Sequence, residues 1–137
     1  MKKILTSLFL FFSLITNISA ETKRIVSGND NAKITIIAFE SLTCSHCADF
    51  HKNVYPQLKK EYIDTGLAKI EFRHFPLDIA ALNASKIAQC KEDQSLEILE
   101  SLYSNQQAWV KGNTIDDIND NLKRFVKSQG YKVNFEK

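Results

Sequence analysis

The feature that most constrains this chain is a pair of cysteines, Cys44 and Cys47, placed between two kinds of regular structure. The run Ile34–Phe39 before the pair is apolar and rich in isoleucine, which predicts a strand. From Cys47 to about Tyr62 apolar residues recur at helical spacing, which predicts a helix. A thiol at a helix start lies near unpaired N–H groups and the positive end of the helix dipole. Such surroundings favour a thiolate, so this context predicts thiol–disulfide chemistry.

Two further strands are predicted around this segment. Apolar and charged residues alternate over 67–75, which indicates a strand after the helix, and a short first strand is expected over 22–27. Strand, helix and strand in this order predict a parallel pair joined by a right-handed crossover. The run 33–39 is apolar on both faces, which predicts a central strand covered on both sides. Pro56, inside the helical pattern, predicts a kink.

Three helices are predicted after the second strand of this unit. Asp78 is expected to cap the first of them, and Ser95 or Asp93 the second. The sequence Thr114-Ile115-Asp116-Asp117 is typical of a capping box that begins the third helix, which ends near Gly130. No further strand signal follows these helices in the sequence.

The first twenty residues differ in kind from the rest of the chain. A short basic start precedes an apolar stretch that ends in the small residues Ser19-Ala20. This pattern predicts a secretory signal peptide over residues 1–20, cleaved after Ala20, and leaves one domain over residues 21–137. An uncleaved membrane anchor is the alternative. Export would place the cysteines in surroundings where disulfides form and persist.

Charge and cysteine count exclude several classes of protein. Loss of Lys2 and Lys3 reduces the 18 basic residues to 16, which equals the 16 acidic residues. A formally neutral chain has no bias toward nucleic acid or anionic lipid, so no nucleic-acid partner is predicted. Three cysteines are too few for a scaffold stapled by disulfides. Cys90, alone in a helical segment, is predicted to be a small buried hydrophobic residue.

Three stretches resemble the DsbA-like branch of the thioredoxin superfamily, the exported thiol oxidoreductases of bacteria. They are Ile34–Phe39, Ser41–His51 and Phe72–Asp78, and the resemblance extends over most of residues 21–137. It implies an α/β, thioredoxin-like fold with a helical insertion after the second core strand. It also implies a periplasmic enzyme that needs no cofactor, forms disulfides in unfolded exported proteins, and is reoxidised by a membrane quinone-linked oxidase. No dimerisation segment is visible, so a monomer is expected.

The chain departs from this family at its C-terminal side. The family closes its sheet with further strands and a final helix, after a cis-proline loop that faces the two cysteines. Here the only prolines are Pro56 in the first helix and Pro76 after the second strand, and neither fits that position. The closing strands and final helix are therefore predicted to be missing, and residues 21–137 to be an incomplete domain of a longer protein. The alternative is a short variant whose open sheet edge is covered by a partner.

A second departure concerns the acid that this family often places six residues before the first cysteine. That position is Ala38 here, whereas Glu40 lies two residues later on the same face of the strand. Glu40 is therefore predicted to act as a proton acceptor near Cys47. The alternative is an ordinary glutamate at the end of a strand.

The predicted chemistry assigns a different role to each residue of the pair. Cys44, exposed at the helix start, is predicted to be the attacking and leaving sulfur, and Cys47 its shielded partner. His46, which can carry charge near neutral pH, is predicted to stabilise the Cys44 thiolate, although a solvated loop histidine is the alternative. A stabilised reduced form makes the couple more oxidising, which favours a donor of disulfides.

Other functions stay open on the sequence alone. Within the same chemistry the alternatives are a disulfide isomerase or reductase. Outside it, the alternatives are an inert disulfide and a partner- or zinc-binding module without turnover, with zinc held by Cys44, Cys47 and either His46 or His51. No second CxxC and no paired histidines support a metal site, so none is predicted.

Overall fold

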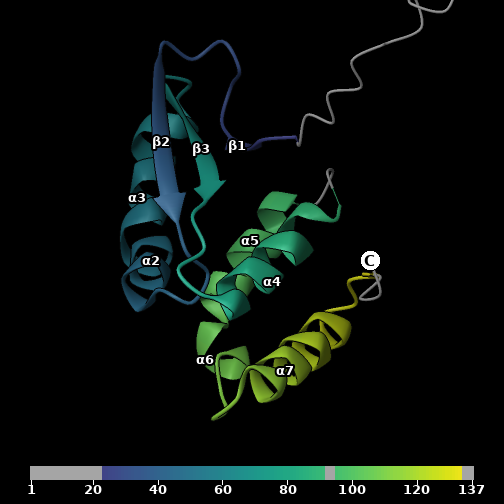
Figure 1. Ribbon diagram of the computed structural model, residues 1–137. Helices are drawn as coiled ribbons and strands as arrows, with labels where there is room; N and C mark the ends of the chain where they lie inside the picture. The colour runs from purple at the N-terminus through teal and green to yellow at the C-terminus, as the bar shows by residue number, and fades with distance from the viewer. Residues whose placement is uncertain (1–22, 92–94, 134–137) are drawn as a thin grey trace, which may run out of the picture.

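A three-stranded mixed sheet forms one part of the molecule (Figure 1). The computed structural model describes residues 23–91 and 95–133. The strands are β1 (Ile25–Ser27), β2 (Ile34–Glu40) and β3 (Ala68–His74), in the spatial order β1-β3-β2. β2 runs parallel to β3 and β1 runs antiparallel to it. The predicted strand–helix–strand unit with a parallel pair is therefore confirmed.

The segment between β2 and β3 is helical from Ser45 to Ile63, but not uniformly. It consists of α2 (Ser45–Asp49), the π-helical η1 (Phe50–Val54), α3 (Tyr55–Leu58) and the π-helical η2 (Lys59–Ile63). Proline has no N–H to donate, so Pro56 breaks the regular ladder. The turn before it accommodates this break, because the Tyr55 N–H bonds to the Phe50 carbonyl five residues earlier. π turns therefore lie before and after the α-helical turn that contains Pro56, and the predicted kink stays a prediction.

The two faces of the sheet differ in cover. On one face, Ile36 and Ala38 pack with Ile70 and Phe72 against the core beneath the helical segment. On the other face, Phe39 is 62% exposed, and Ile37 is exposed as well. The prediction that residues 33–39 form a central strand covered on both sides is wrong for the described part of the chain, because β2 lies at the edge of this sheet.

A block of helices follows β3 (Figure 1). It comprises α4 (Ile79–Gln89), α5 (Ser95–Ser104), the short α6 (Gln106–Trp109) and α7 (Ile115–Ser128). Asp78 caps α4 by accepting the Ala81 N–H at 2.7 Å, and Thr114 forms the predicted capping box with Asp117. α5 contacts β1, α2 and η1, so it joins this block to the helix that carries the cysteines. The expected helical insertion is confirmed, with α6 as an element that the periodicity did not reveal.

The interior of the helical block is apolar and closely packed. Trp109, Leu102 and Leu122 are almost fully buried. Cys90, in contrast, is exposed, so its prediction as a buried residue is wrong. It occupies the C-cap of α4, beyond the last turn whose buried face carries Ile87 and Ala88.

Several predictions concern residues that lie outside this description. The signal peptide over residues 1–20 and the cap at Asp93 lie outside the described ranges. Among residues 23–91 and 95–133 no strand follows β3, and no helix is long and apolar enough to cross a bilayer.

Candidate active site

Cys44 is the N-cap of the helix that follows β2. Its backbone is extended, with φ −76° and ψ 119°, and α2 begins at the next residue. The Cys44 Sγ accepts the Cys47 backbone N–H at 3.4 Å. The helix therefore begins two residues earlier than predicted, because the thiol itself satisfies one of its unpaired N–H groups. Cys44 and Cys47 are both free thiols and both half-buried, so Cys44 is less exposed than predicted.

These contacts lower the pKa of the Cys44 thiol. The largest cause is the hydrogen bond with the Cys47 side chain, followed by the Cys47 backbone N–H, while burial acts in the opposite direction. The His46 backbone N–H lowers the pKa further. His46 itself is exposed on the first turn of α2. Its contribution here comes from the backbone, and the role of its imidazole stays a prediction.

Cys47 has the opposite character. Burial is the main reason why its pKa rises to about 11, against a smaller lowering by the Ser41 backbone. The Cys44 hydrogen bond and the charges of Cys44 and Glu40 raise it further. Its side chain packs against the core cluster. The pair thus combines one thiol whose pKa is lowered with one whose pKa is raised. The roles of Cys44 as attacking sulfur and Cys47 as its shielded partner stay predictions.

Glu40 lies at the buried end of β2, with 6% of its surface exposed. Its Oε2 is 2.8 Å from the Nε2 of His51, in a hydrogen bond between two buried side chains. The charge of Glu40 is one of the smaller causes that raise the pKa of Cys47. The role of Glu40 as a proton acceptor stays a prediction. In the sequence, His51 stands out only as an alternative zinc ligand, and no pattern there predicts its hydrogen bond with Glu40.

The loop that carries Cys44 is fixed from the helical block. Gln106, which is buried in α6, donates one hydrogen bond to the Leu42 carbonyl at 2.8 Å and one to the Cys44 carbonyl at 3.0 Å. From the other side, Thr43 donates its hydroxyl to Asp78 at 2.6 Å. Sequence reasoning missed Gln106, because a glutamine among polar residues carries no signal that it will be buried 62 residues from its partner.

The described residues do not favour a metal site. No three His, Cys, Asp or Glu side chains within residues 23–91 and 95–133 are grouped as a cation would require. Of the two histidines considered as ligands, His51 is bonded to Glu40 instead.

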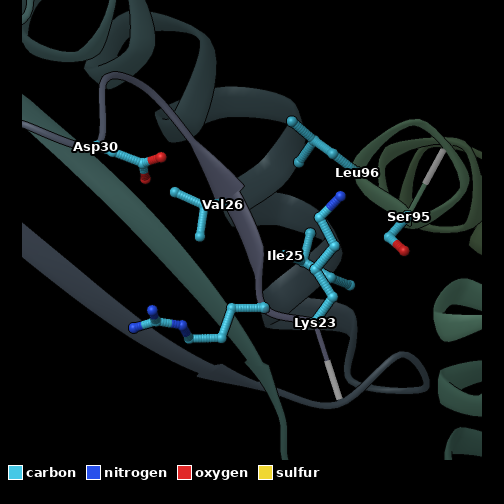
Figure 2. Close-up of a pocket in the computed structure, with 7 residues that line it drawn as sticks. Lys23, Ile25, Val26, Asp30, Ser95 and Leu96 are labelled. Carbon is cyan, nitrogen blue, oxygen red and sulfur yellow. The ribbon is translucent and has the colours of Figure 1, made fainter. Parts of the chain in front are cut away.

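Cavities lie on two sides of the molecule. One cavity of about 510 Å³ lies between β1 and the start of α5, and its lining contains no residue of the helix that carries the cysteines (Figure 2). Its lining residues include Lys23, Ile25 and Leu96. Another, of about 580 Å³, lies between α2–η1 and α5–α6. It is lined by Ser45, next to Cys44, and by His51. Of these two, only the second adjoins the cysteine pair.

Residues 20–135 match a family model whose description is thioredoxin. The chain belongs to the thioredoxin family. A relative from Rickettsia bellii that carries the name protein-disulfide oxidoreductase is 36% identical over 90 residues, which are 64% of this chain and 35% of the relative. Disulfide bond formation protein D of Bacillus subtilis is 26% identical over 121 residues, covering 82% of this chain and 54% of that protein.

Solved structures agree with this family. The crystal structure of Wolbachia pipientis α-DsbA1 superimposes with a TM-score of 0.71 and 32% identity, covering 82% of this chain and 56% of that one. The predicted resemblance to DsbA-like proteins and the thioredoxin-like fold with a helical insertion are therefore confirmed. The chain spans about a third of the length of the Rickettsia relative and a little over half of the Wolbachia protein.

The opposite pKa directions predict two distinct reactivities. In reduced protein, the rate of alkylation at Cys44 should remain high below pH 8.5, because a lowered pKa keeps the thiolate populated as the pH falls. Alkylation at Cys47 should rise only as the pH approaches 11. Iodoacetamide labelling followed by peptide mass spectrometry resolves the two sites, with the exposed Cys90 as an internal reference. Equal pH profiles at Cys44 and Cys90 would contradict the assignment.

The contacts of Gln106 predict that a distant substitution alters Cys44. Gln106→Leu removes the donor to two carbonyls and should lower the free energy of unfolding by about 1–3 kcal/mol. It should also shift the alkylation profile of Cys44 toward higher pH, because the N-cap geometry loosens. Gln107→Leu, one residue along and exposed, is the matched control and should change neither. Urea denaturation and labelling measure the two effects, and equal behaviour of the variants would refute the role of Gln106.

Proposed function

We propose that this chain catalyses thiol–disulfide exchange at Cys44 and Cys47 and donates disulfides to other proteins. One observation carries the proposal, namely that the Cys44 Sγ caps its own helix and accepts the Cys47 N–H at 3.4 Å. That arrangement stabilises negative charge on the more reactive sulfur. The names of the Rickettsia and Bacillus relatives support the same class of reaction.

The exchange would proceed in two displacements. A substrate thiolate attacks the Cys44 sulfur of the oxidised pair, the Cys44–Cys47 bond breaks, and the Cys47 sulfur leaves with the electron pair and takes up a proton. A second substrate thiolate then attacks the substrate sulfur of the mixed disulfide and displaces Cys44 as a thiolate. The substrate leaves with a new disulfide, and the two cysteines remain reduced. A low pKa at Cys44 favours the second displacement, since a more stable thiolate is a better leaving group.

The direction of exchange follows from the same stabilisation. A hydrogen-bonded Cys44 thiolate exists only in the reduced protein, so it lowers the free energy of that form and makes the oxidised form a stronger oxidant. This favours a donor of disulfides over an isomerase or reductase. In this proposal Glu40 exchanges a proton with Cys47, and the imidazole of His46 adds to the stabilisation of the Cys44 thiolate.

The cellular setting is proposed from the sequence and from the family. A signal peptide over residues 1–20 would direct the protein to the periplasm, where disulfides persist. Its substrates would be unfolded exported proteins, and a membrane quinone-linked oxidase would restore the Cys44–Cys47 disulfide. We expect a monomer.

The activity can be tested on a reduced peptide that contains two cysteines and changes fluorescence when it closes. Oxidised protein should close one peptide per protein molecule within a single turnover, because each cycle consumes one disulfide. Cys44→Ser should abolish closure, whereas Cys90→Ser should leave it unchanged. Cys47→Ser should permit a mixed disulfide with Cys44 when the variant is mixed with an activated peptide disulfide. Slow closure together with fast reshuffling of a mispaired substrate would instead indicate an isomerase.

A further inference from the structure

A groove runs along the helical segment that carries the cysteines, on the side that faces α5 and α6. The cavity of about 580 Å³ described above adjoins a second one of about 210 Å³, because His51, Pro56 and Ser104 line both. We call these two cavities together the side groove. The larger cavity alone has the volume of a ligand site, which is about 300–1,000 Å³.

The floor of the side groove is aromatic and buried. His51 from η1 stacks on Tyr103 from α5, with ring centroids 4.1 Å apart and ring planes inclined by 17°. Tyr55 from α3 lies next to His51, with 5.5 Å between the two centroids. All three side chains are buried, and they come from both walls of the groove. Their contacts therefore fix how far apart the two walls stand.

One end of the side groove lies beside the reactive cysteine. Ser45, the residue after Cys44, lines this end, and so does Gln106. The amide of Gln106 also donates a hydrogen bond to the Cys44 carbonyl at 3.0 Å. A substrate cysteine that bonds to the Cys44 sulfur therefore has the side groove next to it.

The wall that the cysteine helix provides carries two opposite charges at its rim. Asp49 and Lys52 are both exposed and both line the groove. Within residues 23–91 and 95–133 neither of them forms an ion pair, whereas Lys59 at the far end is paired with Asp64. Asp49 accepts a hydrogen bond from Asn53, but a carboxylate has further acceptor positions. Asp49 and Lys52 are therefore the charges on this rim that can pair with a ligand.

The spacing of these two charges matches an extended peptide. Asp49 and Lys52 follow Cys44 by five and eight positions in the chain. These separations correspond to about 8 Å and about 12 Å along a helix axis. An extended chain advances about 3.3 Å per residue, so it covers the two distances in about two and about four residues.

We propose that the side groove binds the extended segment that flanks the reacting cysteine of a substrate protein, and that Asp49 and Lys52 favour a basic residue about two positions and an acidic residue about four positions from that cysteine. This inference rests on the exchange reaction proposed above. It gives the inserted helices a part in substrate selection, because α5 and α6 form the second wall of the groove.

The test uses protein with Cys47→Ser and Cys90→Ser, in which Cys44 is the single thiol. Its substrates are peptides of alanine and serine with one cysteine, activated as a 2-pyridyl disulfide. The Cys44 thiolate attacks the peptide sulfur, the mixed disulfide forms, and pyridine-2-thione leaves and is followed by its absorbance. Each peptide carries one lysine and one glutamate, in either order, at the second and fourth positions from the cysteine. Both chain directions from the cysteine are tested.

The order of the two charges should decide the rate. Lysine second and glutamate fourth should react about threefold faster or more than the reverse order in one of the two directions, as expected of exposed ion pairs. Both peptides have the same composition and net charge, so general attraction does not separate them. Salt at about 1 M should remove the preference.

Two charge swaps locate the preference in the groove. Asp49→Lys with Lys52→Asp should invert it, because the rim charges change places while the net charge of the protein stays the same. Lys60→Glu with Glu61→Lys is the matched control and should keep it, since both residues are exposed on the same helical segment and line neither cavity. Equal rates for both orders in both directions, or a preference that survives the first swap, would overturn the proposal.

Obstruction of the groove gives an independent readout. Ser104→Trp places a large ring between the walls and should slow both peptides and remove the preference. Ala108→Trp, on an exposed position of α6 that lines neither cavity, should keep it. Dithiodipyridine is too short to extend along the groove, so its reaction measures Cys44 alone. An equal slowing of this reagent by Ser104→Trp would contradict the role of the groove, whereas a Cys44 unreactive toward it in the parent protein would refute the exchange reaction itself.

Discussion

The hydrogen bond from the Cys47 N–H to the Cys44 Sγ is the interaction on which the rest of the site depends. Through this bond Cys44 becomes the N-cap of the helix. Its sulfur accepts the backbone N–H that a serine or aspartate oxygen usually accepts at this position. A thiolate accepts this bond more strongly than a thiol does, so folding and ionisation of Cys44 favour one another. Burial distinguishes the two sulfur atoms further, because it raises the pKa of the Cys47 thiol to about 11.

The rest of the fold holds this helix start in position. The loop that carries Cys44 follows β2, whose last residue is the buried Glu40. Gln106 of the helical block and Asp78, the N-cap of α4, hold this loop by hydrogen bonds. Asp78 serves twice, since it caps α4 and also accepts the hydroxyl of Thr43. The inserted helices therefore support the reactive pair as well as enlarging the core. At the end of β2 the buried side chains of Glu40 and His51 are hydrogen-bonded to each other at 2.8 Å.

The sequence was most informative where structure depends on neighbours in the chain. The cysteines at a helix start, the cap at Asp78 and the capping box at Thr114 were all predictable, because each uses contacts within one turn. The wrong prediction for β2 has a different cause. β2 was expected to be covered on both faces, because an apolar pattern reports the tendency to be buried but not which elements are present to bury it.

The contacts that the sequence could not reveal join residues far apart in the chain. Gln106 reaches Cys44 across 62 positions, and His51 meets Glu40 across a loop and a helical turn. Cys90 is predicted to be buried because free cysteines are among the most buried residues, whereas its place at the C-cap of α4 exposes it. Residue type alone does not determine burial at a helix end.

The reduction potential of the Cys44–Cys47 couple tests the central claim most directly, because it measures how far the reduced form is stabilised. It is obtained by equilibrating the protein with glutathione buffers and quantifying the two redox forms. Stabilisation of the Cys44 thiolate predicts a potential above about −200 mV, on the oxidising side of the glutaredoxins. A potential near about −270 mV, the range of the reductant thioredoxin, would contradict the account.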